Sequence, residues 1–482
     1  MLVCGLILIQ TFISILISTV PLEQQLYGRT GRGLGLILVI SSLILFLVTI
    51  IFIDLKSIHY ICIGLIIASV VSSIYTIFQK FGLDVFEWNT RTNGLIGTVG
   101  NPNFQSALSC LALPPLLAIL INKRRYYSIL IYFAIGIVAY CIFICASTQG
   151  YLASLFALFT YVLTYLWYKN RNLFSLCSLV ASIFLIFTIL GMMGKGPLSY
   201  YLDKISLRSR FEMWQTALNA ISSKPLFGFG LESFGDISPK FKPNNIMTGV
   251  NEFADNPHNY YLDYAVSGGV LLALLYLILT FLVLYSFVKS IKRNLEFNPY
   301  IAALMSSWIA LQAQSIISPR TITLTSWNCF LGAVLIGLNF KIHGSELKLK
   351  NANVRSLSNG LSALSLILAI TVIFPYWNAD HLQLRSEQTR NGNIAIQSAT
   401  MYPESVVRYS RITIELLTSG LYEQALFVGR SAVEFNPYSS ATWLLIVAND
   451  KAPLAERIKA RQKVLELDPY NIAIKHFTLP EK

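Results

Sequence analysis

One histidine stands out among the residues that could carry chemistry. His258 lies in the segment Asn256-Pro257-His258-Asn259-Tyr260, after a long polar segment and just before an apolar stretch. An imidazole changes its charge near neutral pH, so it can take a proton from a reacting group or return one. A lone histidine is more often structural than catalytic, but the position of His258 beside a membrane entry favours a catalytic role.

Two arginines lie earlier in the same polar segment. Arg208 and Arg210 precede the amphipathic stretch 211–218, which is followed by the proline- and glycine-rich stretch 224–235. This composition predicts a tight, shaped turn rather than a helix at 224–235. On the outer membrane face, an arginine can bind a phosphate through two parallel hydrogen bonds. The alternative for either arginine is that it only reaches from the membrane interface toward the headgroups.

The remaining motifs disfavour several other chemistries. The sequence has no His-Glu-x-x-His motif, no Walker A loop and no aspartate-rich metal cluster. The glycine-rich stretch 31–35 leads into an apolar span, which argues against nucleotide binding. All seven cysteines lie in apolar stretches, so the exposed parts offer no disulfide and no thiolate metal site. We therefore expect neither a metal nor a cofactor.

Apolar helices must position these side chains. Charged residues make up 13% of the 482 residues and hydrophobic residues 54%, whereas a soluble globular protein carries roughly 25% charged residues. This composition excludes a cytosolic enzyme, a disordered chain and a nucleic-acid reader. Crossing a bilayer takes about 20 apolar residues. The sequence predicts an all-α, polytopic membrane bundle of eleven or twelve spans, with eleven stretches at about 2–20, 34–53, 58–78, 103–122, 127–146, 149–168, 173–192, 266–288, 299–317, 325–341 and 358–376.

The placement of lysine and arginine predicts the orientation of these spans. Basic residues accumulate on cytoplasmic loops, and they are frequent in the connectors after the fourth, sixth, eighth and tenth spans. The connector after the fifth span carries no basic residue, and the connector after the ninth span carries Arg320 alone. We therefore expect the N-terminus inside, and the loop 79–102, the large loop at about 193–257 and the tail from residue 377 outside.

The tail is predicted to be a separate helical unit. After the expected membrane domain 1–376, the region 377–482 regains charged residues and an amphipathic helical pattern. The stretches 432–438 and 464–470 resemble each other, and Pro437 and Pro469 are 32 residues apart, close to the 34-residue period of tetratricopeptide repeats. Stacked helix pairs of this kind offer a surface for a protein partner or for bracing the membrane domain.

Four motifs, in this order, resemble those of the O-antigen ligase and polymerase superfamily. They are Thr98-Val99-Gly100-Asn101-Pro102-Asn103-Phe104, Arg210 with Trp214, Pro225 with Gly228, Gly230 and Phe234, and His258-Asn259. The resemblance of these motifs covers roughly residues 90–340. The predicted helical repeats at the C-terminus also resemble an arrangement found in many members. The superfamily contains lipopolysaccharide O-antigen ligases, polymerases of lipid-linked repeat units and protein O-oligosaccharyltransferases of the bacterial inner membrane.

The resemblance implies transfer of a glycan from an undecaprenyl-pyrophosphate carrier to a hydroxyl of a lipid, glycan or protein acceptor, without metal or nucleotide. Outer-face arginines would stabilise the negative charge of the leaving pyrophosphate. The matching positions make His258 and Arg210 the candidate catalytic residues. They make Asn259, Arg208, Asn101 and Asn103 candidate substrate-binding residues, Arg208 with less support.

One position departs from the family pattern. Many members have an arginine where this chain reads Ser147-Thr148-Gln149-Gly150, so Gln149 would contact sugar or phosphate more weakly. Arg29, Arg32, Arg91 or Arg320 could supply the missing charge, since all are expected outside. The sequence does not choose among these arginines, although Arg320 remains a candidate substrate-binding residue.

Three functions stay open at this point. The first is a ligase or oligosaccharyltransferase, and the second is a polymerase that joins lipid-linked repeat units. These two share a donor and differ in the acceptor, about which the sequence is silent. The third is a transporter or membrane scaffold, which midplane acidic residues or inverted repeats would favour. We find neither feature, so a glycosyl-transferring enzyme is the favoured prediction.

Overall fold

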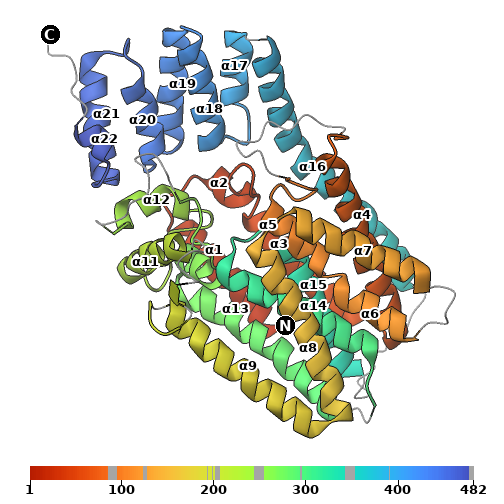
Figure 1. Ribbon diagram of the computed structural model, residues 1–482. Coiled ribbons are helices and arrows are strands. Elements are labelled where there is room, and N and C mark those ends of the chain that lie inside the picture. Colours follow the sequence, from red (N-terminus) through yellow and green to blue (C-terminus); the bar gives the residue numbers. More distant parts are fainter. Residues whose placement is uncertain are drawn as a thin grey trace.

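The fold is all-α, as predicted. The computed structural model describes residues 1–84, 95–122, 128–192, 194–197, 199–200, 207–243, 254–293, 296–341, 353–389 and 391–476. Every regular element in these ranges is a helix, and the helices form a long apolar bundle with a smaller helical layer at one end (Figure 1).

The helices of the bundle coincide with the eleven predicted stretches. Within the described residues, seven segments are long and apolar enough to cross a membrane. These segments comprise η1 (Leu55–Ser57) with α4 (Ile58–Lys80), α5 (Pro102–Cys110) with α6 (Leu113–Asn122), α8 (Thr148–Lys169), α9 (Arg171–Met192), α13 (Tyr260–Arg293), α14 (Pro299–Ile317) and α15 (Ile322–Lys341). The shorter apolar helices α1 (Leu2–Leu16), α3 (Leu36–Phe52) and α7 (Ser128–Ile144), and the long α16 (Asn353–Thr389), match the other four. The protein is thus a polytopic membrane protein.

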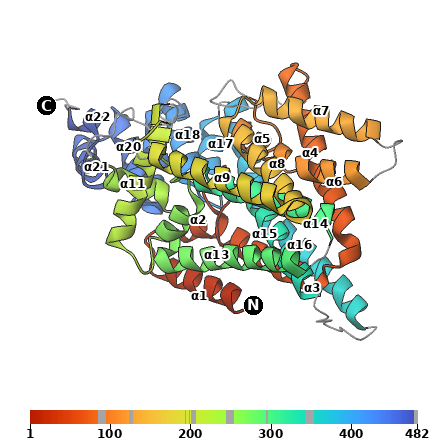
Figure 2. The same cartoon turned by 60° about the horizontal axis from the view of Figure 1, so that its bottom comes forward.

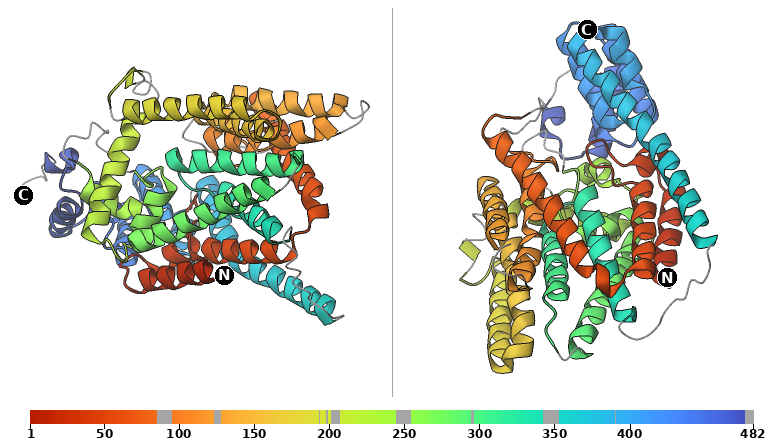
Figure 3. Two further views of the ribbon diagram at one scale, coloured as in Figure 1. Left: turned by 90° about the horizontal axis from the view of Figure 1, so that it is seen from below. Right: turned by 90° about the vertical axis from the view of Figure 1, so that its right-hand side faces the viewer.

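Helix α14 lies in the middle of the bundle, between α8 and α15 (Figures 2 and 3). Small residues on its surface, including Ala303, Ser307 and Ala310, are fully buried. Small side chains let helix backbones approach closely, which is how membrane helices gain packing energy without a hydrophobic driving force. The Ser307 hydroxyl also donates to the Leu111 carbonyl at 2.8 Å, between α5 and α6.

Helix α13 is sharply broken at Gly268–Gly269, where the backbone angles are not helical. The first part folds back over the second, since the rings of Tyr264 and Tyr276 stack with centroids 3.7 Å apart. Residues twelve positions apart in a straight helix would lie about 18 Å apart. Gly269 has φ +78°, and a Cβ there would lie 2.1 Å from the Leu226 carbonyl oxygen, so the break requires glycine.

Side chains of α1 satisfy the backbone groups freed by this break. Gln10 donates to the carbonyl oxygens of Gly268 at 2.7 Å and Leu226 at 2.9 Å, and Ser14 donates to that of Ser267 at 2.5 Å. Irregular backbone at membrane depth is tolerated only where other groups satisfy its amides and carbonyls. The stretch 224–235, predicted as a turn rather than a helix, is non-helical over residues 224–233, but Phe234 and Gly235 already belong to the next helix. The turn packs against the same break, so it positions the start of α13.

The tail forms stacked antiparallel helices with their own small apolar cores. They are α17 (Gly392–Ala399), α18 (Val406–Thr418), α19 (Tyr422–Phe435), α20 (Ser440–Ala448), α21 (Leu454–Leu467) and α22 (Ile472–Lys475). The two similar stretches end α19 and α21 at equivalent places, which agrees with a helical repeat; membership of the tetratricopeptide family stays a prediction. Helix α16 runs unbroken from the bundle into the tail, so the predicted boundary at residue 377 falls inside one helix.

The tail and the loops of the membrane domain meet at one end of the bundle (Figure 3). Helix α12 (Phe234–Phe241) packs against α20 and α21, and Lys242 forms an ion pair with the buried Asp468 at 2.8 Å. After α2 (Leu22–Tyr27), the hydroxyls of Thr30 and Ser405 lie 2.6 Å apart. The segments expected outside therefore share one end of the molecule.

Candidate functional site

His258 sits in a strained turn that leaves one imidazole nitrogen available. Its φ is +54°, in the left-handed region that residues other than glycine rarely adopt. The Asn256 side chain accepts from the His258 N–H at 2.8 Å, and His258 Nδ1 lies 3.1 Å from the Asn256 carbonyl oxygen. A carbonyl oxygen can only accept, so Nδ1 carries a proton in this contact. In the neutral ring, Nε2 then keeps its lone pair and can act as a base.

The surroundings of His258 favour its neutral form. Burial lowers the pKa of His258 most, the hydrogen bond to Asn256 raises it, and the charges of Arg32 and Arg210 lower it further. The net pKa lies below the ordinary value for histidine. His258 is therefore unprotonated at neutral pH, the state required of a general base.

Arg210 is a cation whose charge reaches this histidine. It lies in the first turn of α11 (Leu207–Ser223), partly buried, and its burial lowers the pKa of its guanidinium. No carboxylate within the described residues forms an ion pair with Arg210. The same helix carries Arg208, whose side chain lies outside the described residues, as does Arg91. An unpaired, partly buried guanidinium is a suitable site for an anionic ligand.

Arg320, by contrast, lies inside a closed ionic cluster. Its side chain is 1% exposed, its Nε donates to Asp263 at 2.5 Å, and its Nη2 lies 4.0 Å from Glu232. Burial alone would lower the pKa of Arg320, but the charges of Asp263, Tyr264 and Glu232 raise it, so the guanidinium stays charged. A direct phosphate contact by Arg320 would require these pairs to open.

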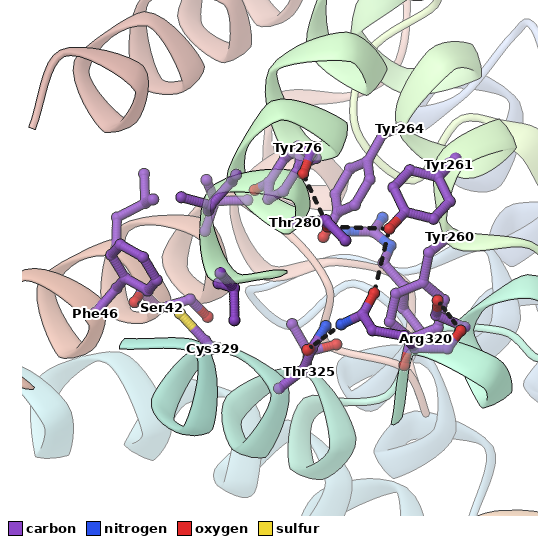
Figure 4. A pocket seen from close by; sticks show the side chains of 18 of the residues that line it. Ser42, Phe46, Tyr260, Tyr261, Tyr264, Tyr276, Thr280, Arg320, Thr325 and Cys329 are labelled. Carbon is purple, nitrogen blue, oxygen red and sulfur yellow. Dashed lines mark hydrogen bonds between the residues drawn. The ribbon is translucent and has the colours of Figure 1, made fainter. Parts of the chain in front are cut away.

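A cavity adjoins this cluster, between α3, α13, α14 and α15 (Figure 4). The cavity has a volume of about 70 Å³, and Tyr264 lies between the Arg320 guanidinium and the ring of Tyr276. One water needs roughly 10–15 Å³, so a few waters fit beside Arg320. Such a water would satisfy Nη2 of Arg320, which has no hydrogen-bond partner among the described residues.

Two further arginines come from the connection between α1 and α3. Arg29 lies 3.5 Å from the buried Asp236, and its backbone N–H donates to Glu232 at 3.1 Å. Arg32 donates to both carboxylate oxygens of Asp255, at 2.9 and 2.5 Å. Both arginines therefore stand at the same end as His258, and each has a carboxylate partner.

The predicted asparagines cap helices at this end of the bundle. The Asn259 side chain accepts from the N–H groups of Tyr261 and Leu262 at 3.0 Å, so it caps the start of α13. Asn101 caps α5 in the same way, by accepting from the N–H of Asn103 at 2.8 Å. The side-chain oxygens of Asn259 and Asn101 are therefore used to cap helices. Contact between these asparagines and substrate stays a prediction.

Side-chain contacts join these helix ends. Asn103 accepts from Ser147 at 2.6 Å, and Ser147 caps α8 by accepting from Gly150 N–H at 3.1 Å. The buried Gln149 accepts from Gln314 of α14 at 3.2 Å. Asn259 in turn donates to Ile316 of α14 at 3.0 Å. The N-termini of α5, α8 and α13 therefore gather around the end of α14, and helix N-termini favour anions.

Backbone strain is concentrated in the same place. In the described part of the chain, Ala146, Glu232 and His258 are the non-glycine residues with positive φ. Ala146 precedes the cap of α8, and Glu232 belongs to the Arg320 cluster. Strained backbone of this kind persists where the surrounding structure holds it, often at functional sites.

The acidic residues of the site were not foreseen from the sequence. Glu232, Asp236, Asp255 and Asp263 pair with Arg29, Arg32 and Arg320. One signal was present, because Asp263 is an acid a few residues before an apolar span and such residues need a partner. Across the described ranges, no group of three histidines, cysteines or acids is arranged to hold a metal ion.

Comparison with known proteins finds a family match that covers part of this site. Residues 105–277, which include Arg210 and His258, match the sequence model of a family described as O-antigen ligase. A stretch of 110 residues is 33% identical to an uncharacterized protein of Haemophilus influenzae (strain ATCC 51907 / DSM 11121 / KW20 / Rd). That match spans 21% of this chain and 27% of the relative's length. Over residues 105–277, the chain is therefore similar to the O-antigen ligase family.

Proposed function

We propose that this protein moves an oligo- or polysaccharide from an undecaprenyl-pyrophosphate carrier to an acceptor hydroxyl. The observation that carries the proposal is that Arg210, which has no ion-pair partner among the described residues, lowers the pKa of the nearby His258 through its charge. In such a transfer, a cation stabilises the phosphates of the leaving group and a base takes the proton of the hydroxyl. The family match over residues 105–277 supports the same class of membrane glycosyl transfer.

In the proposed reaction, the acceptor oxygen attacks the anomeric carbon of the donor sugar. The bond between that carbon and the phosphate oxygen breaks, and undecaprenyl pyrophosphate leaves with the bonding electrons. His258 Nε2 takes the proton of the acceptor hydroxyl. Arg210 and the N-termini of α5, α8 and α13 stabilise the negative charge that develops on the leaving group.

Ligation remains the favoured alternative over polymerisation, and the two differ in the acceptor alone. Deletion of the protein tests both, followed by analysis of surface polysaccharide and of lipid-linked intermediates. A ligase predicts lost attachment with lipid-linked polymer accumulating, whereas a polymerase predicts that single repeat units are attached. Unchanged surface polysaccharide and unchanged lipid-linked pools would contradict the whole proposal.

We further propose that the site faces away from the cytoplasm, in the bacterial inner membrane. The pattern of basic loops supports this orientation, and the contacts between the tail and the site loops mean that both share one face. A cysteine at the exposed Tyr438 should react with a membrane-impermeant thiol reagent in outer-membrane-permeabilised cells, whereas one at Lys56 should not. The reverse labelling pattern would contradict this orientation.

A further inference from the structure

The glycine-rich arginine turn, residues 28–33, has no role in the mechanism described so far. The carbonyl oxygen of Arg29 accepts from the N–H groups of Arg32 at 2.9 Å and Gly33 at 3.1 Å, which closes the turn. Gly28 and Gly33 have positive φ, and a Cβ on Gly28 would lie 2.3 Å from the backbone of Leu34. The shape of the turn therefore requires glycine at these two positions.

Contacts from three other parts of the chain hold this arginine turn in place. Glu232 accepts from the backbone N–H of Arg29, and Thr30 contacts Ser405 of the tail. A Cβ on Gly33 would lie 2.8 Å from Ile322, so the turn also packs against the start of α15. A turn anchored from three sides presents Arg32 in one direction, toward Asp255.

The pair between Arg32 and Asp255 is open to solvent on its acidic side. The Asp255 side chain is 51% exposed, whereas that of Arg32 is 17% exposed. Asp255 lies three residues before His258, and the charge of Arg32 reaches both side chains. The Asp255 carboxylate thus accepts two hydrogen bonds from the Arg32 guanidinium, beside the proposed base. Because the Asp255 side chain is half exposed, it can rotate into solvent.

We propose that Arg32 is the second phosphate-binding arginine of the site, and that Asp255 occupies its fork until the donor pyrophosphate displaces it. This inference rests on the proposed function, and it identifies the cation that replaces the arginine missing at Gln149. A carboxylate and a phosphate accept the same two parallel hydrogen bonds from a guanidinium. An exposed ion pair shifts an equilibrium by about fivefold or less, so a pyrophosphate with more negative charge displaces the carboxylate.

The other two candidate arginines are less suited to this exchange. Arg320 is 1% exposed and is enclosed by Asp263 and Glu232. Arg29 pairs with Asp236, which is itself 2% exposed and also accepts from Gln24 at 2.8 Å. If the acid partners of either arginine moved into solvent, a mostly buried guanidinium would be left without a counter-charge. Among the described residues, Arg32 is the paired arginine of this end whose partner is free to leave.

The test measures binding of geranyl pyrophosphate to the purified full-length protein in nanodiscs with EDTA, by titration calorimetry. Arg32→Ala should weaken binding by about tenfold or more, because it removes two charge-assisted hydrogen bonds. Arg32→Lys should recover little, because an ammonium lacks the fork. Asp255→Ala should strengthen binding by about two- to fivefold, because it removes the competitor.

The chain offers a matched control in the tail. Arg430 donates to both carboxylate oxygens of Glu456, at 3.1 and 2.6 Å, and forms an exposed pair of the same geometry. Arg430→Ala should leave the affinity for geranyl pyrophosphate unchanged. Thermal unfolding of each variant separates loss of binding from loss of fold, and the gain expected for Asp255→Ala does not depend on the stability of any Arg32 variant.

The opposite signs of the two effects decide the outcome. If the pair is only structural, Arg32→Ala and Asp255→Ala change the affinity in the same direction, and the inference is overturned. If Arg210→Ala loses binding while Arg32→Ala binds like wild type, this inference fails and the proposed function stands. If the wild type does not bind geranyl pyrophosphate at all, both fail together.

Discussion

Two groups of charged residues lie at the same end of the bundle and are built for different purposes. The first is the Arg320 cluster, in which one guanidinium is enclosed by Asp263 and Glu232 and all three side chains are at most 4% exposed. The second is the His258 region, in which Arg210 has no acid partner among the described residues and Arg32 has an exposed one. The protein itself satisfies the first group, whereas our proposal assigns the arginines of the second to a ligand.

The difference shows how arginines can be assigned without a bound substrate. A buried pair whose acids cannot move holds loops together, and here it connects the turn 224–233, the start of α13 and the entry to α15. Breaking such a pair leaves an uncompensated buried charge. A partly exposed arginine without a fixed partner adds little to folding and is available to an anion.

The largest effect is expected at His258. His258→Ala should reduce kcat for glycan transfer by about 10²- to 10⁴-fold, which is the usual contribution of a general base, while donor binding survives. His59 provides a matched control, because its Nδ1 also lies 3.1 Å from a backbone carbonyl oxygen, that of Lys56. His59→Ala should transfer glycan at the wild-type rate. A folded His258→Ala protein with wild-type turnover would show that the base lies elsewhere or that none is needed.

The next effect concerns stability rather than activity. Arg320→Ala should destabilise the protein by about 3–5 kcal/mol, because Asp263 and Glu232 would be left buried without a cation. Thermal unfolding in detergent and expression level measure this loss. Arg210→Ala should unfold within a few degrees of the wild type. Equal unfolding temperatures for the two variants would remove the distinction between the closed and open groups.

Arg210 should affect donor binding and turnover together. Arg210→Ala should weaken donor binding about 10- to 100-fold and also lower kcat, since the phosphates are charged in both ground and transition states. Arg210→Lys should restore little of either, because an ammonium cannot reproduce a two-bond fork. Steady-state kinetics with varied donor separate the two quantities. Full rescue by lysine would indicate that charge alone matters at this position.

A smaller effect is expected in the pH profile. The pKa of His258 is lowered below its ordinary value by burial and by the charges of Arg32 and Arg210, and the neutral form is the base. Activity should therefore be constant above about pH 6.5 and fall only below it, as protonation removes the base. Arg32→Ala removes one positive charge, so the falling limb should move to higher pH. An unchanged limb would place Arg32 too far from His258 to matter.

Much of the scaffold was predictable because membrane helices are read directly from apolar length. All eleven stretches coincide with helices, and the turn at 224–233 follows from its prolines and glycines. The sharp break in α13 was not foreseen, although Gly268 and Gly269 stand in the sequence. Its geometry depends on Gln10 and Ser14, which are far away in the chain.

For the candidate site, the sequence named residues but could not indicate how they pair. Motif order indicated His258 and Arg210, and the charge of Arg210 reaches His258 in the folded chain; their catalytic roles stay predictions. Whether Arg320 or Arg32 faces a ligand depends on Asp263 and Asp255, and pairing of this kind is a property of the folded chain. Asn101 and Asn259 illustrate the same limit, because capping a helix and contacting a sugar both suit an asparagine.

The central claim is that this end of the bundle transfers a glycan and releases a polyprenyl pyrophosphate without a metal. The most direct measurement incubates the purified wild-type protein with an undecaprenyl-pyrophosphate-linked glycan and a candidate acceptor in excess EDTA, and follows both products by mass spectrometry. We predict equal amounts of glycosylated acceptor and free undecaprenyl pyrophosphate, with neither formed by His258→Ala on the same timescale. Transfer that strictly requires an added divalent ion would contradict the account, as would transfer by His258→Ala at the wild-type rate.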